Sequence, residues 1–523
     1  MDYLVHHMLS SSARRLPEKL AIVHGPERLA YKELIQRVEA LAAALRLAGV
    51  ERGDRVGIYL DASIAQVVSI FAISRAGGVF VPINAELFPD QVGHIVRDCS
   101  MKLLIFPASR AEELAPALNS ISTLKAVVTT GTLSPGHLNV PAYCFEELLK
   151  TEPDYTRPDA AISKDLGAIL YTSGSTGKPK GVMLSHANIM AGATIVSTYL
   201  GITETDRILA ALPFSFDAGL NQLTTAIQQG GTIVLIKFVF GREVVEKLVE
   251  EQITGLAGVP TLWSLLAQPS SGLQKRQLPH LRYITNTGGA MPQSVLKVLR
   301  TVLPSTRIFL MYGLTEAFRS TFLPPEELER RPTSMGKAIP DTEILVINEH
   351  GQECKPGEVG ELVHRGPTVS LGYWGNPEAT AKVLRPNPLA PAELGDQERV
   401  CYSGDLVRKD EEGYLYYIGR RDTMIKCSGH RISPTEVEEV LFQSGQVRQA
   451  AVIGVPDEMM GQAVKAFVVA RDGGEVELAK LLAYCGERVP RYMIPRRIDV
   501  LDELPKTTSG KVDYPALRRR EGL

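Results

Sequence analysis

The chain has 523 residues, of which 44% are hydrophobic and 22% are charged, and its 57 Lys and Arg nearly balance its 59 Asp and Glu. This length can bury a large interior and predicts several domains or subdomains. Because the composition is that of an ordinary globular protein and the charges balance, nothing in it indicates binding to nucleic acid or to an anionic membrane.

The cysteines and the first residues bear on the location of the protein. The six cysteines lie far apart, without a CxxC pair or a histidine cluster at metal-ligand spacing, so we expect reduced thiols. The N-terminal MDYLVHHMLSSSARRLPEK lacks the basic start and the apolar stretch of a signal peptide. No segment has 18 uninterrupted apolar residues, as a membrane-spanning helix would need. These features predict a cytoplasmic protein without a membrane span.

Helix-like and strand-like segments alternate through the first hundred residues. Apolar residues recur at helical spacing between Leu34 and Leu45, and the strand-like RVGIYL follows. The pattern repeats, with IAQVVSIFAISRAGG and QVGHIVRDC typical of helices and VFVPIN and KLLIF typical of strands. Such alternation predicts an α/β fold of parallel sheets covered by helices, with ligands near the carboxyl ends of the strands.

Two changes of pattern divide the rest of the chain. The segments GTIVLIKFV, ITGLAGVP, LRYITNTGGA and RIFLMYGLTE each predict a short strand that runs into a turn where chemistry is expected. From about residue 340 to 420, short strands and turns predict a small β-rich subdomain. From 421 to 523 the pattern predicts a compact α+β domain. We therefore predict a large N-terminal domain over residues 1–420 and a small C-terminal domain over residues 421–523.

The segment YTSGSTGKPKGV, from Tyr171 to Val182, collects hydroxyls, glycines and two lysines directly after an apolar strand. A flexible surface loop is the ordinary explanation for such a composition. The GxxxxGK[ST] spacing of a Walker loop is absent. Hydroxyl donors, open backbone N–H groups and positive charge can nevertheless hold phosphate, and a helix beginning near SHANIMAG would complete the setting of a phosphate loop.

Seven motifs, in this order along nearly the whole chain, carry a family resemblance: YTSGSTGKPKGV, NTGGAMP, MYGLTEA, SMGKAIP, YSGDL, GRRDTMIKCSGHRISPTEVE and LPKTTSGKVD. The sequence resembles the adenylate-forming superfamily, which includes acyl-CoA synthetases, the adenylation domains of nonribosomal peptide synthetases and luciferases. The resemblance implies that ATP activates a carboxylic acid as an acyl-adenylate, with release of pyrophosphate. The acyl group then passes to the phosphopantetheine thiol of CoA or of a carrier protein, with release of AMP.

The resemblance also implies residues for the phosphates and for catalysis. Thr315 would donate to the α-phosphate, and Glu316 would bind Mg²⁺, a hard cation that suits a carboxylate. Lys511 would be the catalytic lysine, bridging the attacking carboxylate and the α-phosphate, although alone it would pass for a solvated side chain. The residues predicted to bind the β- and γ-phosphates are Thr172, Ser173, Gly174, Ser175, Thr176, Gly177 and Lys180.

Further residues would bind the nucleoside. Tyr312 would stack on adenine and Asp405 would accept from the ribose hydroxyls, although a core tyrosine and a turn aspartate are the ordinary explanations. Arg420 and Arg431 would contact ribose and phosphate, where surface arginines are the alternative. Small residues would leave room for adenine and the acyl group: Gly288, Gly289, Ala290 and Gly313. The small domain would swing about a hinge at Asp422, which makes it a mobile domain.

The stretch LPFSFDAGLNQL aligns with the acid pocket of the family. Phe216 would be an aromatic gate, or alternatively a core residue, and Asn221 would line the pocket. Asp217 matches an aspartate that pairs with the ammonium group in amino-acid-activating relatives, but it could equally bond to a backbone turn. The residues after it depart from the peptide-synthetase pattern and look closer to exosortase-associated ligases. Both a plain carboxylic acid and an amino acid therefore stay open as substrates.

The acceptor and the class of function have alternatives too. The motifs do not separate CoA from a carrier protein, and we expect any carrier to be a separate protein because the chain stops soon after Lys511. A non-catalytic nucleotide-binding relative is disfavoured because the charge-bearing residues are all present: Lys180, Glu316, Asp405, Arg431 and Lys511. A luciferase-like oxygenase would share every motif, and the C-terminal RRREGL supplies no peroxisomal address in its favour.

Overall fold

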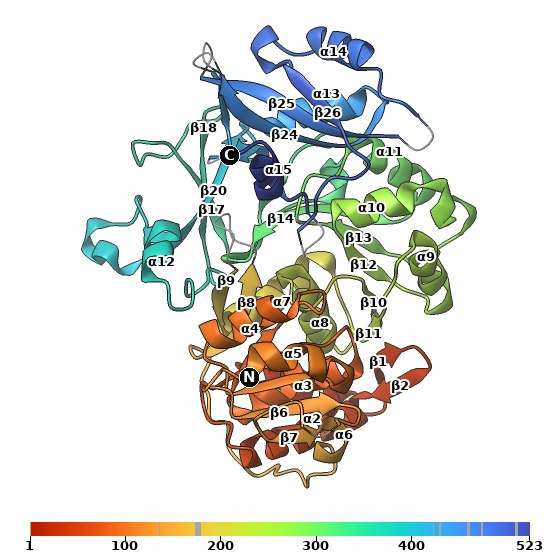
Figure 1. Ribbon diagram of the computed structural model, residues 1–523, viewed down its shortest axis with the longest axis vertical. Helices are drawn as coiled ribbons and strands as arrows, with labels where there is room; N and C mark the ends of the chain where they lie inside the picture. The colour runs from red at the N-terminus through yellow and green to blue at the C-terminus, as the bar shows by residue number, and fades with distance from the viewer. Residues whose placement is uncertain are drawn as a thin grey trace.

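The protein is described by a computed structural model that covers residues 2–134, 136–172, 179–421, 423–427, 430–457, 461–471, 474–507 and 511–523. Four β-sheets with their covering helices make up this part of the chain. In Figure 1 the first half of the chain occupies the lower body, and the last hundred residues sit above it. None of the helices in these ranges is long and apolar enough to cross a membrane.

A seven-stranded sheet is formed early in the chain, with the order β7-β6-β5-β3-β4-β8-β9. Its pairs are parallel except β8 with β9, which run antiparallel. Its strands are β3 (Arg55–Ile58), β4 (Val79–Pro82), β5 (Leu103–Pro107), β6 (Ala126–Thr130), β7 (Ala142–Cys144), β8 (Leu166–Thr172) and β9 (Lys180–Ser185).

A nine-stranded sheet has the order β16-β15-β14-β13-β12-β10-β11-β1-β2. Its first two strands come from the N-terminus, where β1 pairs in parallel with the distant β11 and β2 forms the edge. The strands are β1 (Leu20–His24), β2 (Glu27–Ala30), β10 (Arg207–Ala210), β11 (Thr232–Leu235), β12 (Gly255–Gly258), β13 (Tyr283–Asn286), β14 (Arg307–Leu314), β15 (Ala317–Leu323) and β16 (Lys337–Ala338).

Helices bury the faces of these two sheets. One large apolar cluster joins α2, α3, α7 and α8 to strands of both sheets, with Phe71, Phe80 and Phe214 fully buried in it. This shared core fixes the two sheets against each other. The helices are α1 (Val5–Arg15), α2 (Tyr31–Leu47), α3 (Ile64–Ala76), α4 (Pro89–Asp98), α5 (Ala111–Leu118), α6 (Phe145–Leu148), α7 (His186–Leu200), α8 (Asp217–Gln229), α9 (Gly241–Glu250), α10 (Pro260–Ala267) and α11 (Gln293–Val302).

The predicted β-rich segment forms a separate five-stranded antiparallel sheet with its own small cores. It contains β17 (Glu343–Ile347), β18 (Val359–Arg365), β19 (Leu384–Pro386), β20 (Arg399–Lys409) and β21 (Leu415–Arg420), and the helix α12 (Pro377–Val383) lies between β18 and β19 in sequence. The sheet is seen beside the large body in Figure 1.

The last hundred residues form an α+β unit around a fourth sheet. Alternate residues of β24 enter different apolar clusters: Ala450 and Val452 pack with α13 and α14, while Ala451 and Ile453 pack with α15. The elements are β22 (Ile425–Cys427), β23 (His430–Ile432), α13 (Pro434–Gln443), β24 (Val447–Asp457), β25 (Gly461–Ala470), α14 (Leu478–Gly486), β26 (Arg497–Val500) and α15 (Tyr514–Arg520). The predicted fold class, a large α/β body with a β-rich part and a small α+β part, is confirmed.

A histidine and aspartate cluster anchors α1 to the large body. His6 Nε2 and His7 Nε2 lie 2.9 and 2.8 Å from the two oxygens of Asp159. Among the described residues these three form a group whose ligand atoms could hold a metal ion. Arg75 Nη1 lies 3.1 Å from the same carboxylate and already supplies a cation. Sequence spacing did not reveal the cluster because Asp159 is 152 residues from His7.

Glu438 on α13 makes the stability of the C-terminal unit depend on pH. Its buried carboxyl accepts hydrogen bonds from the Val452 N–H at 2.8 Å and the Tyr514 hydroxyl at 2.7 Å. Burial raises its pKa to about 7. The folded value lies above the unfolded one, so the stability that protonated Glu438 provides is complete below the unfolded pKa and is lost as the pH rises through about 7.

We expect Glu438→Gln, which stays neutral, to remove this loss. Wild type should therefore lose more free energy of unfolding than the variant between about pH 5 and about pH 8. Urea denaturation of both proteins, followed by circular dichroism at the two pH values, measures the difference. An identical pH dependence in the two proteins would show that Glu438 does not titrate in this range.

Candidate active site

Lys511 comes from the C-terminal unit but lies against the large body. Its Nζ is 5.6 Å from the centre of the Phe216 ring. A Cβ added at Gly288 would lie 3.3 Å from Lys511 Cε and 3.7 Å from Nζ. The Thr507 N–H donates to the Lys511 carbonyl oxygen at 2.7 Å, which holds these two residues together. Three segments that are far apart in sequence thus meet at one place, and Lys511 makes no ion pair with a described carboxylate there.

The hydroxyl-rich segment connects two antiparallel strands. Thr172 ends β8 and Lys180 begins β9, and the two residues are paired. Ser173, Gly174, Ser175, Thr176 and Gly177 lie outside the described residues. The predicted helix after the segment is α7, which begins at His186 with Ser185 as its cap. The strand β9 lies between the segment and the helix, so the segment links two antiparallel strands and the helix follows β9.

Glu316 lies in the turn between β14 and β15, next to the buried Thr315. The Tyr373 hydroxyl donates to its Oε1 at 2.5 Å, and Lys180 Nζ lies 5.5 Å from the centre of the Tyr373 ring. Burial, together with the Glu316 carboxylate, raises the pKa of Tyr373, so this hydroxyl stays protonated and donates. The tyrosine therefore joins the lysine of the hydroxyl-rich segment to the predicted magnesium ligand.

The donor set around Glu316 fits a magnesium ion. One carboxylate oxygen is held by Tyr373, and no described residue bonds to the other. Mg²⁺ prefers hard oxygen ligands and is usually held by one or two carboxylates together with substrate phosphates. Glu316 can therefore supply the protein ligand while a triphosphate supplies the others.

The predicted nucleoside residues meet at the β-rich sheet. Tyr312 on β14 donates its hydroxyl to Asp405 Oδ2, and Arg420 Nη1 lies 3.3 Å from Asp405 Oδ1. Burial, the charge of Asp405 and this hydrogen bond raise the pKa of Tyr312, which keeps the phenol neutral as a donor. Asp405 and Arg420 are also paired neighbours on β20 and β21. Of Arg431 only the backbone is described, in β23.

The glycine turn after β13 is open where Lys511 approaches. Gly288 has φ of +80°, a left-handed conformation that favours glycine, and Gly289 and Ala290 are exposed beside it. Gly313 on β14 also needs to be glycine, because an added Cβ would lie 3.0 Å from the Arg319 backbone. Both glycines therefore let main chain or side chains come close at the predicted site.

The predicted acid pocket lies at the start of α8. Phe216 caps the helix, and Asp217 and Asn221, one turn apart, are buried with 5% and 2% of their surface exposed. Asn221 Nδ2 has no hydrogen-bond partner. A buried amide donor without a partner is costly, and a ligand group can satisfy it. The structure therefore places these residues on the same helix start as Phe216, the residue whose ring lies near Lys511 Nζ.

Two residues near the site escaped the sequence analysis. Tyr373 belongs to the stretch LGYWGN, where an isolated tyrosine after a glycine gives no sign that it bonds to Glu316. Arg319 lies three residues after Glu316 and is buried. A charged residue in an otherwise apolar and hydroxyl-bearing strand, AFRSTFL, was the available signal for it.

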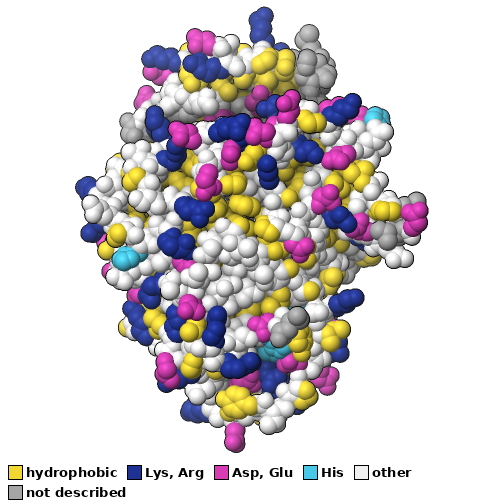
Figure 2. All heavy atoms as spheres, turned by 180° about the vertical axis from the view of Figure 1, so that it is seen from behind, with side chains coloured by type: hydrophobic (Ala, Val, Ile, Leu, Met, Phe, Trp, Pro, Cys, Tyr) yellow, Lys and Arg dark blue, Asp and Glu magenta, His cyan; other side chains and the backbone are white. Residues whose placement is uncertain are grey.

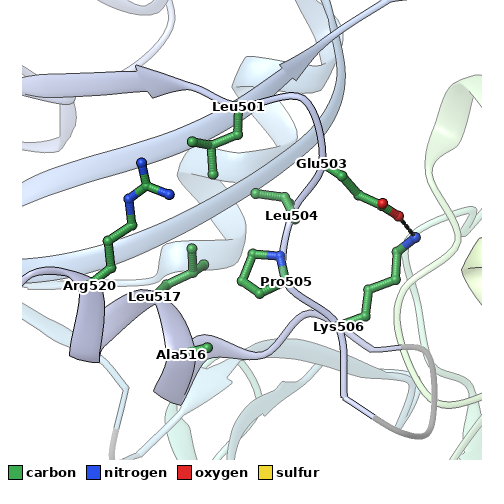
Figure 3. A pocket seen from close by; sticks show the side chains of 8 residues that line it. All are labelled: Leu501, Glu503, Leu504, Pro505, Lys506, Ala516, Leu517 and Arg520. Atoms are coloured by element: carbon green, nitrogen blue, oxygen red, sulfur yellow. Dashed lines mark hydrogen bonds and ion pairs between the residues drawn. The ribbon is translucent and has the colours of Figure 1, made fainter.

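A separate pocket on the C-terminal unit contains none of the predicted site residues. Figure 3 shows it between the 501–506 segment and α15, with the Glu503–Lys506 ion pair at one side and apolar side chains such as Leu504 and Leu517 facing the space. The face shown in Figure 2 mixes acidic and basic side chains without a large patch of one sign, as the balanced composition predicts.

Comparison with known proteins shows the family of the chain. The sequence models of the AMP-binding enzyme family and of its C-terminal domain match residues 9–374 and 436–511. A feruloyl-CoA synthase from Amycolatopsis sp. is 33% identical over 513 residues, which span 98% of this chain and 97% of the relative.

Solved structures are similar over almost the full length. The anthranilate CoA ligase AuaEII, in complex with anthranoyl-AMP, has a TM-score of 0.89 at 26% identity and covers 99% of this chain and 97% of its own. The o-succinylbenzoate CoA synthetase from Bacillus subtilis, in complex with ATP and a magnesium ion, has a TM-score of 0.82 at 28% identity and covers 97% and 98%. The chain therefore belongs to the AMP-binding enzyme family of adenylate-forming acid–thiol ligases.

Proposed function

We propose that this ligase activates a carboxylic acid at the junction of Lys511, Gly288 and Phe216, with ATP and Mg²⁺, and transfers the acyl group to the thiol of CoA. The observation that carries the proposal is the position of Lys511, whose ammonium group reaches the glycine turn and the start of α8 from another unit. A positive group at that position can neutralise two anions that have to approach each other.

In the first half-reaction, a carboxylate oxygen of the acid bonds to the α-phosphorus of ATP, and the bond from that phosphorus to the bridging oxygen of pyrophosphate breaks. Lys511 would contact both the carboxylate and the α-phosphate, and Thr315 would donate to the same phosphate. Lys180 and the hydroxyl-rich segment would hold the leaving pyrophosphate. A magnesium ion on Glu316, when bound, supplies further positive charge for the phosphates.

The nucleoside would lie between the glycine turn and the β-rich sheet. Tyr312 would present its ring to adenine, while Asp405 and Arg420 would face the ribose, and Arg431 would add a contact to phosphate or ribose. The support is that the first three side chains already bond to one another, so they form one prepared surface.

The second half-reaction needs Lys511 to withdraw so that a pantetheine arm can enter. We place the hinge at Asp422, which lies outside the described residues. The chain before it is fixed to the β-rich sheet, because the Arg421 N–H donates to the Gly404 carbonyl at 2.8 Å and Arg421 Nη1 lies 3.0 Å from Glu361. From Ile425 onward the chain belongs to the C-terminal sheet. We also keep the domain boundary at residues 420–421 as a prediction, and these contacts support a boundary close to it, with Arg421 still held by the β-rich sheet.

We expect Asp422→Pro to impair the two half-reactions unequally, since proline fixes φ near about −65° and a hinge residue has to change φ. ATP–pyrophosphate exchange measures the first half-reaction, and thioester formation from a preformed acyl-adenylate measures the second. The control variant is Glu411→Pro, at an exposed position. The neighbouring Asp410 is not used, because proline there would remove a backbone hydrogen bond. Equal retention of both half-reactions in Asp422→Pro would contradict the hinge.

A plain carboxylic acid is the proposed substrate, and an amino acid is the second candidate. The buried Asp217 favours the second, because a carboxylate with 5% exposure calls for a cationic or donor partner and an α-ammonium group would provide one. The resemblance of AGLNQL to exosortase-associated ligases stays a prediction, since the relatives described above carry no such link. All six cysteines are free thiols, which suits the cytoplasm.

An ATP–pyrophosphate exchange screen over carboxylic acids and amino acids tests the proposed function. We expect exchange with at least one acid and, when CoA is added, formation of its thioester and AMP. Comparison of an amino acid with its deaminated analogue, in wild type and in Asp217→Ala, decides between the two substrate classes. Exchange with no acid at all, or exchange that is independent of added acid, would contradict the function.

A further inference from the structure

Arg319 is a buried cation beside the candidate site. It lies on β15 with 4% of its surface exposed, and its φ is +80°, a conformation that side-chain-bearing residues rarely adopt. Gly313 on the paired strand makes room for its backbone, which would lie 3.0 Å from any Cβ at that position. Strained backbone of this kind is unfavourable and persists where the surroundings fix it.

The guanidinium group has little to neutralise it. Arg319 Nη1 lies 3.3 Å from the Thr287 hydroxyl, while its Nε is fully enclosed and has no hydrogen-bond partner. No described carboxylate is within ion-pair distance of it. For comparison, the buried Arg75 bonds to both Glu39 and Asp159. A guanidinium keeps its charge in a protein interior, so an anion is needed to complete the Arg319 site.

The position of Arg319 indicates where that anion comes from. Among the described residues its guanidinium bonds to Thr287, which directly precedes Gly288, and Gly288 is the residue that Lys511 approaches. Arg319 and Lys511 therefore reach neighbouring residues of the same glycine turn. A ligand that places one carboxylate at Lys511 can extend toward Arg319 with the rest of its chain.

We propose that Arg319 binds a second carboxylate of the acid, so that the enzyme prefers dicarboxylic over monocarboxylic substrates. The inference rests on the proposed function, because it assumes that the reacting carboxylate lies at Lys511. A planar carboxylate can accept from Nε and a terminal nitrogen of the guanidinium together, and it would give Nε the partner that it lacks. The Thr287 hydroxyl and the free Asn221 amide can provide further hydrogen bonds.

A nucleotide phosphate is the other anion that could reach a buried arginine here. The two possibilities predict different kinetic effects of the arginine. A phosphate contact would serve every acid equally and would appear in the KM for ATP, whereas a contact to the acid would appear in the choice between substrates.

A panel of matched acids tests the inference by ATP–pyrophosphate exchange. Each monocarboxylate is compared with the dicarboxylate of equal chain length, butyrate with succinate and valerate with glutarate, and an aromatic pair, benzoate with terephthalate, extends the range. Adding 2-aminobutyrate and aspartate separates the effect of the second carboxylate from that of an amino group. We expect wild type to exchange faster with the dicarboxylate of at least one pair.

The variant Arg319→Met keeps an unbranched side chain and a side-chain-bearing residue at the strained backbone position, but it removes the guanidinium and its charge. We expect the ratio of kcat/KM for the preferred dicarboxylate to that for its monocarboxylate to fall by about 100-fold or more. The KM for ATP should stay unchanged. Arg307→Met, at an exposed position where β14 begins, is the matched control and should keep the wild-type ratio. Thermal unfolding of each variant verifies that it is folded.

Three results would overturn the inference. One is a wild type in which no dicarboxylate is preferred over its partner, including the case in which none supports exchange. Another is an unchanged preference in folded Arg319→Met. The last is a rise in the KM for ATP that is the same for all acids. Exchange with monocarboxylates that depends on Lys511 would leave the proposed function standing while the inference fails, so the two failures are distinguishable.

Discussion

Replacing Lys511 with alanine is expected to slow acyl-adenylate formation by about 10²–10³-fold, because the variant removes the positive group that lies between the two reacting anions. Thioester formation from a preformed acyl-adenylate should change much less, since that step involves no approach of a carboxylate to a phosphate. Pyrophosphate exchange and single-turnover thioester formation measure the two steps separately. This asymmetry is the signature of a lysine that acts in one half-reaction.

Lys506→Ala is the matched control for this experiment. Lys506 lies on the same loop, but it is ion-paired with Glu503 near the pocket of Figure 3 rather than at Gly288. We expect this variant to retain both half-reactions. If Lys511→Ala exchanges pyrophosphate as fast as wild type, or if Lys506→Ala is equally impaired, the role assigned to Lys511 is wrong.

Replacing Gly219 with alanine should have a large effect on stability. Gly219 lies in the first turn of α8, and an added Cβ would come within 2.0 Å of the Pro213 carbonyl oxygen and 2.7 Å of the Leu212 carbonyl oxygen. The same Pro213 oxygen accepts the Phe216 N–H at 3.0 Å. Because both close atoms are backbone, α8 has to shift, at a cost of about 3–5 kcal/mol.

Urea denaturation measures that cost, and pyrophosphate exchange shows whether the displaced helix still holds Phe216 and Asp217 in place. Gly201→Ala provides the comparison. Gly201 ends α7 with φ of +61°, but nothing lies within 4 Å of an added Cβ, so only about 1 kcal/mol of backbone strain is expected. Equal losses of stability in the two variants would contradict the close contact at α8.

Local elements were predictable from the sequence because their signals are local. The helix predicted between Leu34 and Leu45 is α2, and the strand predicted from KLLIF is β5. The pairing of β1 with β11 was not predictable, since no local pattern relates Ile22 to Ile233. The same reason hid the contacts of His6 and His7 with Asp159. Long-range pairing depends on packing that the alternation of apolar residues does not specify.

The candidate site likewise contains residues that motifs reveal and residues that only the folded structure reveals. Motifs identified Lys511, Glu316 and Asp405, and the structure places the first beside the glycine turn, the second in the turn between β14 and β15, and the third within β20. Tyr373 was missed because its importance lies in its hydrogen bond to Glu316. Arg319 was missed because its importance lies in the lack of a partner for its Nε. Burial without a counter-charge is a property of the folded chain, and residue type alone does not reveal it.

The most direct test of the account follows oxygen atoms through the reaction. The acid that is most active in pyrophosphate exchange is supplied with both carboxylate oxygens as ¹⁸O, and AMP released after CoA addition is analysed by mass spectrometry. If the carboxylate attacks the α-phosphorus, its bridging oxygen leaves with AMP when the thiol takes the acyl group, so each AMP gains one ¹⁸O atom. AMP without the label, or label found in pyrophosphate instead, would contradict the account.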